Sequence, residues 1–144
     1  MDPEIEILIV EDNPSELELT IYALKKHHLA NRIFVLRDGA EAIHYLFEEK
    51  DQNSDFSSLK LILLDLKLPK VSGIEVLRRI KSDPRTRDIP VVVMTSSRQD
   101  QDLQECYQLG VNSYLVKPVN FDHFTEAIRQ VGVYWLLLNR RKDE

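Results

Sequence analysis

The chain has 144 residues, 43% of them hydrophobic and 30% charged, which suits one globular domain with a single core. Its net charge of −5 argues against non-specific nucleic-acid binding, and the longest late apolar run, residues 133–138, is too short to span a membrane. The first residues lack the pattern of a signal peptide and Cys106 is the single cysteine, so we expect a cytoplasmic protein without disulfides, forming one domain over residues 1–144 with its core at 5–139.

Five short segments have the length of strands. They cover residues 5–10, 33–36, 59–64, 90–95 and 112–117, and the first, third and fourth have the largely apolar composition of buried strands. A helix signal follows each of them, at Asn13, Asp38, Ser72, residues 97–100 and near Phe121. The alternation of strand and helix predicts right-handed crossovers and a parallel sheet.

The ends of the helices carry further signals. Asn13 is placed as an N-cap, Pro14 occupies the first helical position, and Glu16 lies where a capping box needs an acidic residue. Gly110 fits the C′ position of the fourth helix. The last helix is expected to run from Phe121 to residue 139 without a break, and the polar segment 48–58 is expected to be a loop.

The predicted fold is a doubly wound α/β sandwich of three layers, with five parallel strands and five helices. A strand order of 2-1-3-4-5 places a topological switch point between the first and third strands. Ligands of such sheets bind at the carboxyl ends of the strands, so the residues that follow each strand are the candidates for function.

Polar residues at four strand ends form the candidate site. Glu11 and Asp12 follow the first strand, Asp65 the third, Thr95 ends the fourth, and Lys117 ends the fifth. Three clustered carboxylates repel one another, and a divalent cation relieves that repulsion. Hard oxygen ligands favour Mg²⁺, so we expect magnesium as the cofactor.

This set of residues also fits phosphoryl chemistry. A carboxylate beside Mg²⁺ and a lysine can attack phosphorus. The magnesium ion and the lysine ammonium offset the negative charge of the transferred phosphoryl group. Thr95 adds a hydroxyl donor for a phosphoryl oxygen. Read singly, these residues have ordinary explanations: a helix-dipole pair at Glu11 and Asp12, a turn residue at Thr95, and a solvated charge at Lys117.

Taken together, these residues and the predicted strands at whose ends they stand make the chain resemble the receiver domain of bacterial two-component response regulators. That domain has a flavodoxin-like fold. The resemblance implies that Asp65 accepts a phosphoryl group from a histidine kinase. It implies Mg²⁺ ligands at Asp12, Asp65 and the Lys67 carbonyl, with Glu11 in the outer shell. It further implies that Thr95 and Tyr114 switch together on phosphorylation, that Lys117 pairs with the phosphate, and that the Lys117–Pro118 peptide is cis.

More narrowly, the chain resembles the single-domain response regulators that serve cyanobacterial phytochromes and bacteriophytochrome kinases. The loop at 48–58, the run at 81–84 before Ile89-Pro90, and the late Tyr134-Trp135-Leu136 carry this narrower resemblance. It implies a phytochrome-like kinase as partner and an unknown downstream protein as target, since we expect no output domain after residue 139.

Two positions depart from what fast self-dephosphorylation requires. Lys67 and Ser97 flank the expected path of an attacking water, and neither side chain is suited to orient it. We therefore expect slow loss of the phosphoryl group. The protein is expected to signal rather than to act as an enzyme, with at most self-phosphorylation and self-dephosphorylation.

The late apolar residues predict an interface between two copies of the chain. Apolar side chains cover every face of the expected last helix from residue 133 onward, which favours a homodimer formed by this helix and the fifth strand. The candidate interface residues are Tyr134, Trp135, Leu137 and Leu138. The alternative is a monomer in which a loop covers this helix.

Two other functions fit a similar sheet. A phosphohydrolase with an aspartyl-phosphate intermediate usually carries a second carboxylate two residues after the nucleophile, where this chain has Lys67. A flavin or nucleotide carrier would need a glycine-rich phosphate loop, and the four glycines of this chain do not cluster.

Overall fold

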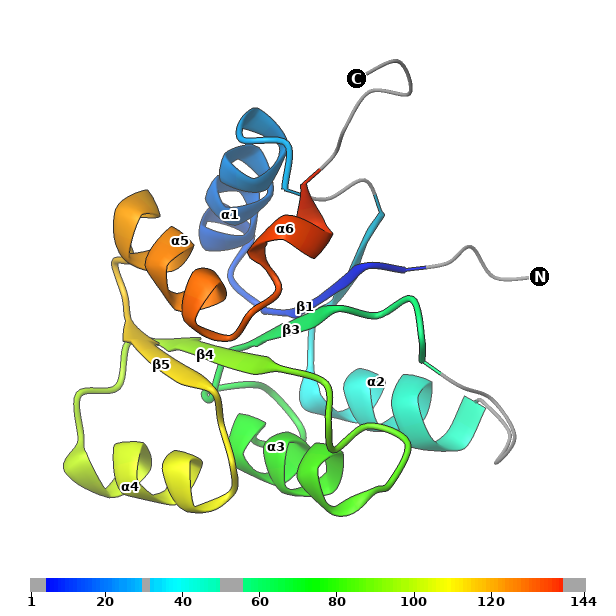
Figure 1. Cartoon of the computed structure of the whole chain (residues 1–144). Coiled ribbons are helices and arrows are strands. Elements are labelled where there is room, and N and C mark those ends of the chain that lie inside the picture. The colour runs from blue at the N-terminus through cyan, green and yellow to red at the C-terminus, as the bar shows by residue number, and fades with distance from the viewer. Residues whose placement is uncertain (1–4, 30–31, 50–55, 139–144) are drawn as a thin grey trace.

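Five strands form one parallel sheet, in a computed structural model that describes residues 5–29, 32–49 and 56–138 (Figure 1). The strands are β1 (Ile7–Val10), β2 (Ile33–Leu36), β3 (Leu61–Leu64), β4 (Val91–Thr95) and β5 (Ser113–Val116). Their order, β2-β1-β3-β4-β5, confirms the predicted order and the predicted fold class. Each strand except β2 is shorter than its predicted segment, by one or two residues at an end.

Two helical layers cover the sheet (Figure 1). One layer holds α1 (Pro14–Lys26), α5 (Phe121–Gln130) and α6 (Tyr134–Leu137). The other holds α3 (Gly73–Ser82), α4 (Asp100–Gln108) and α2 (Gly39–Ile43), which continues as the π-helical segment η1 (His44–Glu49). No helix in the described parts of the chain is both long and apolar enough to cross a lipid bilayer.

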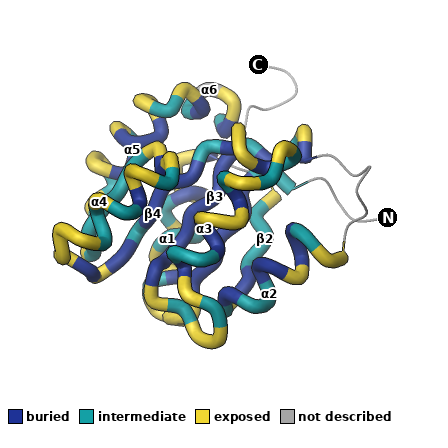
Figure 2. The backbone as a smooth tube through the Cα atoms, turned by 90° about the horizontal axis from the view of Figure 1, so that it is seen from below, coloured by how far each residue is buried: buried dark blue, intermediate teal, exposed yellow. Residues whose placement is uncertain are grey.

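Burial on both faces explains why β1, β3 and β4 consist almost entirely of apolar residues. Successive strand residues alternate between two core clusters: Leu8 and Val10 pack towards α2 and α3, whereas Ile7 and Ile9 pack towards α1 and α5. All four residues of β3 are buried, and Figure 2 shows β3 and β4 as the dark interior of the fold.

The N-caps of α1, α2 and α3 are confirmed, whereas Gln99, which precedes α4, makes no side-chain capping bond. The Asn13 side chain accepts from the Glu16 amide at 3.1 Å, and Asp38 and Ser72 cap α2 and α3 in the same way. The capping box predicted for Glu16 is wrong in its second half. The Asn13 amide donates instead to a Glu11 carboxylate oxygen at 3.2 Å, and the Glu16 carboxylate contacts Lys117, 101 residues away.

The prediction of one unbroken last helix is also wrong. Helix α5 ends at Gln130, and Gly132 adopts a φ of 79°, a left-handed conformation that glycine takes without steric cost. The Gly132 amide donates to Arg129 and the Val133 amide to Ile128, which completes a Schellman motif. The chain then turns into the short helix α6, while residue 139 lies outside the described residues.

This break changes what the late apolar residues do. Leu137 is only 1% exposed and packs in the chain's own core, so it is not available to a partner. Leu136 is 57% exposed, while Tyr134 and Leu138 are half-buried. The side chain of Trp135 is outside what the structure describes.

Candidate functional site

The register of the sheet brings the predicted site residues to one edge. Val10 and Leu64 are paired between β1 and β3, so Glu11 and Asp65 follow directly at the same level, and the Asp65 amide donates to the Val10 carbonyl at 3.1 Å. On the other side of the sheet's centre, the Lys117 amide donates to the Thr95 carbonyl at 2.8 Å.

Three carboxylates gather where β1 and β3 end. Oxygen atoms of Glu11, Asp12 and Asp65 all lie within 4.8 Å of one another, close enough to hold one metal ion. Glu11 and Asp65 are buried, at 6% and 8% exposure, whereas Asp12 is exposed. An oxygen-only group that opens to solvent on one side suits a hard cation that keeps part of its water shell.

The Lys117 ammonium lies among carboxylates from three elements. It donates to Glu11 and Glu16 in short contacts and to Oδ2 of Asp65 at 3.3 Å, while its own side chain is 9% exposed. Burial by itself would lower the pKa of Lys117. The hydrogen bonds to Glu11 and Glu16 and the charge of Asp65 outweigh burial and raise that pKa above its ordinary value. The lysine is therefore firmly protonated.

Glu11 is the carboxylate most affected by this crowding. Burial, together with the charge of Asp65, raises the pKa of Glu11 to about 7 against the opposing hydrogen bonds from Lys117 and the Asn13 amide. One ammonium does not balance the surrounding carboxylates, so a further positive charge at this edge would be favourable.

Asp65 is held from several sides. Its Oδ1 accepts from the Lys67 amide at 3.3 Å and its Oδ2 from Lys117. Gly73, at the start of α3, packs so closely that a Cβ atom there would lie 2.1 Å from the Asp65 carbonyl oxygen. The Gly73 amide also donates to the Leu66 carbonyl at 2.8 Å, which ties the segment after Asp65 to α3.

Thr95 and Tyr114 are connected through one residue of the β4–α4 segment. The fully buried Thr95 hydroxyl accepts from the Ser97 amide at 3.3 Å, and the Tyr114 hydroxyl donates to the Ser97 carbonyl at 3.1 Å. The Ser97 hydroxyl donates to Asp102 of α4 at 2.5 Å. The Lys117–Pro118 peptide is cis, as the resemblance implied.

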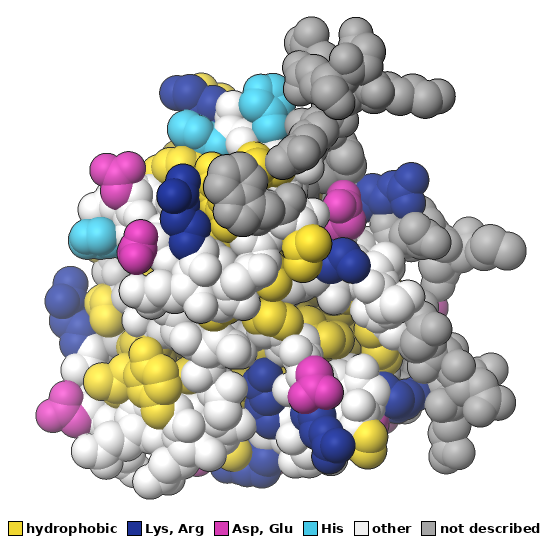
Figure 3. Space-filling view, in the orientation of Figure 1, with side chains coloured by type: hydrophobic (Ala, Val, Ile, Leu, Met, Phe, Trp, Pro, Cys, Tyr) yellow, Lys and Arg dark blue, Asp and Glu magenta, His cyan; other side chains and the backbone are white. Residues whose placement is uncertain are grey.

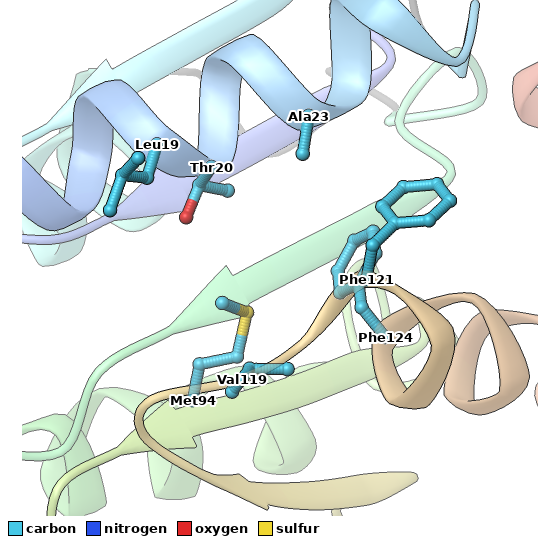
Figure 4. A pocket seen from close by; sticks show the side chains of 7 residues that line it. All are labelled: Leu19, Thr20, Ala23, Met94, Val119, Phe121 and Phe124. Atoms are coloured by element: carbon cyan, nitrogen blue, oxygen red, sulfur yellow. The ribbon is translucent and has the colours of Figure 1, made fainter.

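An apolar pocket of about 90 Å³ lies beside this site (Figure 4). Side chains of α1 face those of Val119 and α5 across it, and its lining residues are Leu19, Thr20, Ala23, Met94, Val119, Phe121 and Phe124. Thr20 and Met94 also line the small hollow that contains Glu11 and Asp65. Since the apolar pocket has no charged lining residue, phosphoryl chemistry belongs to the acidic edge and not to this pocket.

The face shown in Figure 3 carries no continuous basic area among the residues that the structure describes. Lys and Arg side chains are scattered there among acidic and apolar ones. This distribution agrees with the acidic net charge of −5.

The sequence profile of the response regulator receiver domain matches residues 7–129. The chain belongs to this family. The prediction that was based on Glu11, Asp12, Asp65, Thr95 and Lys117 is thereby confirmed at the level of the family.

Similar proteins lie close in sequence and in length. The receiver is 44% identical over 139 residues to the probable methanogenesis regulatory protein FilR2 of Methanothrix harundinacea, covering 96% of this chain and 88% of that protein. It is 36% identical to the response regulator Rcp1 of Synechocystis sp., over 94% and 91% of the two chains.

Among solved structures, the bacteriophytochrome response regulator AtBRR is 50% identical, with a TM-score of 0.76 over 96% of this chain and all of that one. The Mn²⁺-bound form of Rcp1 and the phosphorylated cyanobacterial phytochrome response regulator RcpA are both 37% identical, with TM-scores of 0.72 and 0.74 over 93% of this chain and 95% of each of theirs. These similarities confirm the narrower resemblance to phytochrome-associated response regulators.

One residue of the site was missed by sequence reasoning. Glu16 was assigned only a capping role, because its position after Asn13 fits a local motif. Its contact with Lys117 joins α1 to the end of β5, and no local pattern reports such a contact. The sequence offers one signal for this role: Glu16 is a further acidic residue in the first helical turn after the acidic pair Glu11-Asp12.

Proposed function

We propose that this receiver accepts a phosphoryl group on Asp65 from a partner histidine kinase in a Mg²⁺-dependent reaction. The observation that carries the proposal is the convergence of Lys117 and the Glu11–Asp12–Asp65 group on one edge of the sheet. A buried carboxylate flanked by other acids and one ammonium is suited to receive an electrophilic phosphorus atom.

In the transfer, an Asp65 carboxylate oxygen forms a bond to the phosphorus of a phosphohistidine. The bond between phosphorus and the histidine nitrogen breaks, and its electron pair remains on that nitrogen. Lys117 provides an ammonium beside Oδ2 of Asp65, where it can pair with the negative phosphoryl oxygens. Asp65 is already fixed by the Lys67 amide, which orients the attacking oxygen.

Asp12, Asp65 and the Lys67 carbonyl would hold Mg²⁺, with Glu11 in the outer shell. The bound cation supplies positive charge that offsets the phosphoryl oxygens. Solved relatives support this assignment, since Rcp1 is known in a Mn²⁺-bound form and the receiver of the sensor kinase PA1611, which is 28% identical, carries a magnesium ion in its active-site cleft.

Output is proposed to occur through a change in shape around the β4–α4 segment. Thr95 would move towards the phosphoryl group and Tyr114 would change rotamer with it, both being bonded to Ser97 in the structure. The altered surface would then be recognised by a downstream protein. We place this reaction in the cytoplasm.

For the kinase, a phytochrome-type partner is supported by the bacteriophytochrome and phytochrome regulators among the similar structures. FilR2, a methanogenesis regulator by name, is also 44% identical, so transfer assays with kinases of both kinds would discriminate between the two partners. Faster transfer from a bacteriophytochrome kinase is expected. Preference for the other kinase would overturn the phytochrome assignment.

The decisive test is incubation with acetyl phosphate and Mg²⁺ followed by intact mass spectrometry. The chain should gain one phosphoryl group, and Asp65→Asn should gain none. Asp38→Asn is a matched control, because this carboxylate caps α2 and is not one of the three acids that lie within reach of one metal ion. Equal phosphorylation of wild type and Asp65→Asn would overturn the proposal.

The lifetime of the phosphoryl group can be measured in the same experiment. The Ser97 hydroxyl is engaged by Asp102, and Lys67 is exposed and cationic, so neither is placed to orient an attacking water. We therefore propose slow self-dephosphorylation. Complete loss of the label within seconds after removal of acetyl phosphate would contradict it.

A further inference from the structure

The Lys117 ammonium is shared between the acidic edge and a carboxylate outside it. Of its three partners, Glu11 and Asp65 belong to the candidate metal group, whereas Glu16 comes from the first turn of α1. The contact to Asp65, at 3.3 Å, is the longest of the three. The lysine is thus drawn more closely to the two glutamates than to the residue proposed to accept the phosphoryl group.

Local structure leaves Glu16 free for this role. A glutamate at this position in a helix usually bonds back to the N-cap amide. Here the Asn13 amide donates to Glu11, and the Asn13 side chain caps the Glu16 amide. The Glu16 carboxylate is therefore not needed by its own helix and extends across to β5.

The two ends of this ion pair differ in exposure. The Lys117 side chain is 9% exposed, while that of Glu16 is 40% exposed. A carboxylate that keeps this much contact with water can release its partner at a small cost, because water solvates it again. A buried ammonium cannot be left alone and must find another anion when it leaves Glu16.

We propose that Glu16 is a positioning residue that holds Lys117 in the unphosphorylated receiver and competes with the phosphoryl group for it. This inference rests on the proposed phosphorylation of Asp65. When the phosphoryl group arrives, Lys117 exchanges Glu16 for a phosphoryl oxygen. Glu16 thereby favours the unphosphorylated state and sets how strongly the site retains a phosphoryl group.

The first test measures the affinity for beryllofluoride, a stable mimic of the phosphoryl group, at saturating Mg²⁺ by isothermal titration calorimetry. Glu16→Gln keeps the shape of the side chain and removes the charge, so the affinity should rise by about two- to fivefold, the effect of a half-exposed ion pair. Glu16→Asp keeps the charge on a shorter arm and should give an affinity between those of wild type and Glu16→Gln.

Glu18→Gln is the matched control, since Glu18 carries the same charge on the same helix but is exposed and outside the site. Its affinity for beryllofluoride should equal that of wild type. If Glu18→Gln raised the affinity for beryllofluoride as much as Glu16→Gln, the effect would come from the overall charge of the chain, and the inference would be overturned. If wild type binds beryllofluoride and Glu16→Gln binds it no better, only this inference fails; if wild type does not bind it, the proposed function fails too.

A second test needs no ligand and separates positioning from structural support. Urea unfolding of wild type, Glu16→Gln, Lys117→Gln and the double variant, in the presence of a chelator, forms a double-mutant cycle. The loss of unfolding free energy caused by Glu16→Gln should disappear or reverse in the Lys117→Gln background, because the partner of Glu16 is absent there. An equal cost in both backgrounds would show that Glu16 acts without Lys117 and would overturn the inference.

Discussion

The Tyr114 hydroxyl donates to the backbone carbonyl of Ser97 at 3.1 Å, and the amide of the same Ser97 donates to the Thr95 hydroxyl at 3.3 Å. One residue of the β4–α4 segment therefore connects a side chain at the reactive edge with a half-buried side chain on β5. A movement of Thr95 towards a phosphoryl group would break its bond with the Ser97 amide and release the segment whose carbonyl holds the Tyr114 hydroxyl.

This connection predicts that Tyr114→Phe lowers the stability of the unphosphorylated receiver by about 1 kcal/mol, the usual contribution of one such hydrogen bond. The same variant should bind beryllofluoride more tightly than wild type, because it no longer favours the unphosphorylated arrangement. Urea unfolding and calorimetry measure the two effects. A loss of stability without any gain in affinity would show that Tyr114 supports the fold but does not take part in the switch.

The crowding of carboxylates predicts an unusual dependence of stability on pH. Burial and the charge of Asp65 raise the pKa of Glu11 from 4.5 to about 7, so the folded chain binds a proton that the unfolded chain has already lost. The stabilisation is fully present below pH 4.5 and is lost as the pH rises through 7. With a chelator present, the free energy of unfolding should fall across this interval by about 2 to 3 kcal/mol from this group.

The control for this prediction is Glu11→Gln, which is neutral at every pH. Its unfolding free energy should be flatter than that of wild type between pH 5 and 7.5, in denaturant titrations at matched ionic strength. Saturating Mg²⁺ should also reduce the slope, since a cation favours the ionised carboxylate. An identical slope in wild type and Glu11→Gln would assign the pH dependence to other groups.

Most of the fold and the reactive edge could be predicted because they depend on local patterns. The four residues of β3 before Asp65 are all apolar, since both faces of the strand are covered. The caps at Asn13, Asp38 and Ser72 are read from single residues and their neighbours. Once the parallel order was inferred, the strand ends had to meet at one edge.

The failures have equally physical reasons. The apolar spacing of Phe124, Ile128 and Val131 continues past Gly132, so periodicity alone did not reveal that Gly132 turns the chain out of α5. The contact between Glu16 and Lys117 joins residues 101 positions apart and competes with a local capping motif that is equally plausible from the sequence. A local C-terminal motif decided the first case and a tertiary contact the second, and apolar periodicity reports neither of them.

The close packing of Gly73 against Asp65 predicts that Gly73→Ala disturbs the reactive residue. A Cβ atom there would lie 2.1 Å from the Asp65 carbonyl, so the strand end must shift. We expect a loss of about 1 to 3 kcal/mol in unfolding free energy, together with slower phosphorylation by acetyl phosphate. Gly132→Ala is the comparison, because its φ of 79° strains alanine after the end of α5, where the added Cβ would meet no described atom within 4 Å apart from those of its chain neighbours. It should lower stability but leave the phosphorylation rate unchanged; equal slowing in both variants would contradict this.

The homodimer remains a prediction, now with a narrower surface. Leu137 is buried in the chain's own core, so among the side chains that the structure describes, an interface at α6 would use Leu136 and the half-buried Tyr134 and Leu138. If two copies pair through this surface, analytical ultracentrifugation of wild type should give twice the chain mass of 16.8 kDa. Leu136→Glu should give the mass of a monomer, because pairing would bury its charge without a partner.

Leu19→Glu provides the control for this experiment, since Leu19 is 69% exposed on α1 and carries the same change in hydrophobicity and charge. It should leave the dimer intact. If Leu19→Glu dissociated the dimer and Leu136→Glu did not, the interface would lie on α1 and not on α6. A wild-type particle of single mass at micromolar concentration, both with and without beryllofluoride, would mean that the exposed Leu136 does not serve to pair two copies of this chain.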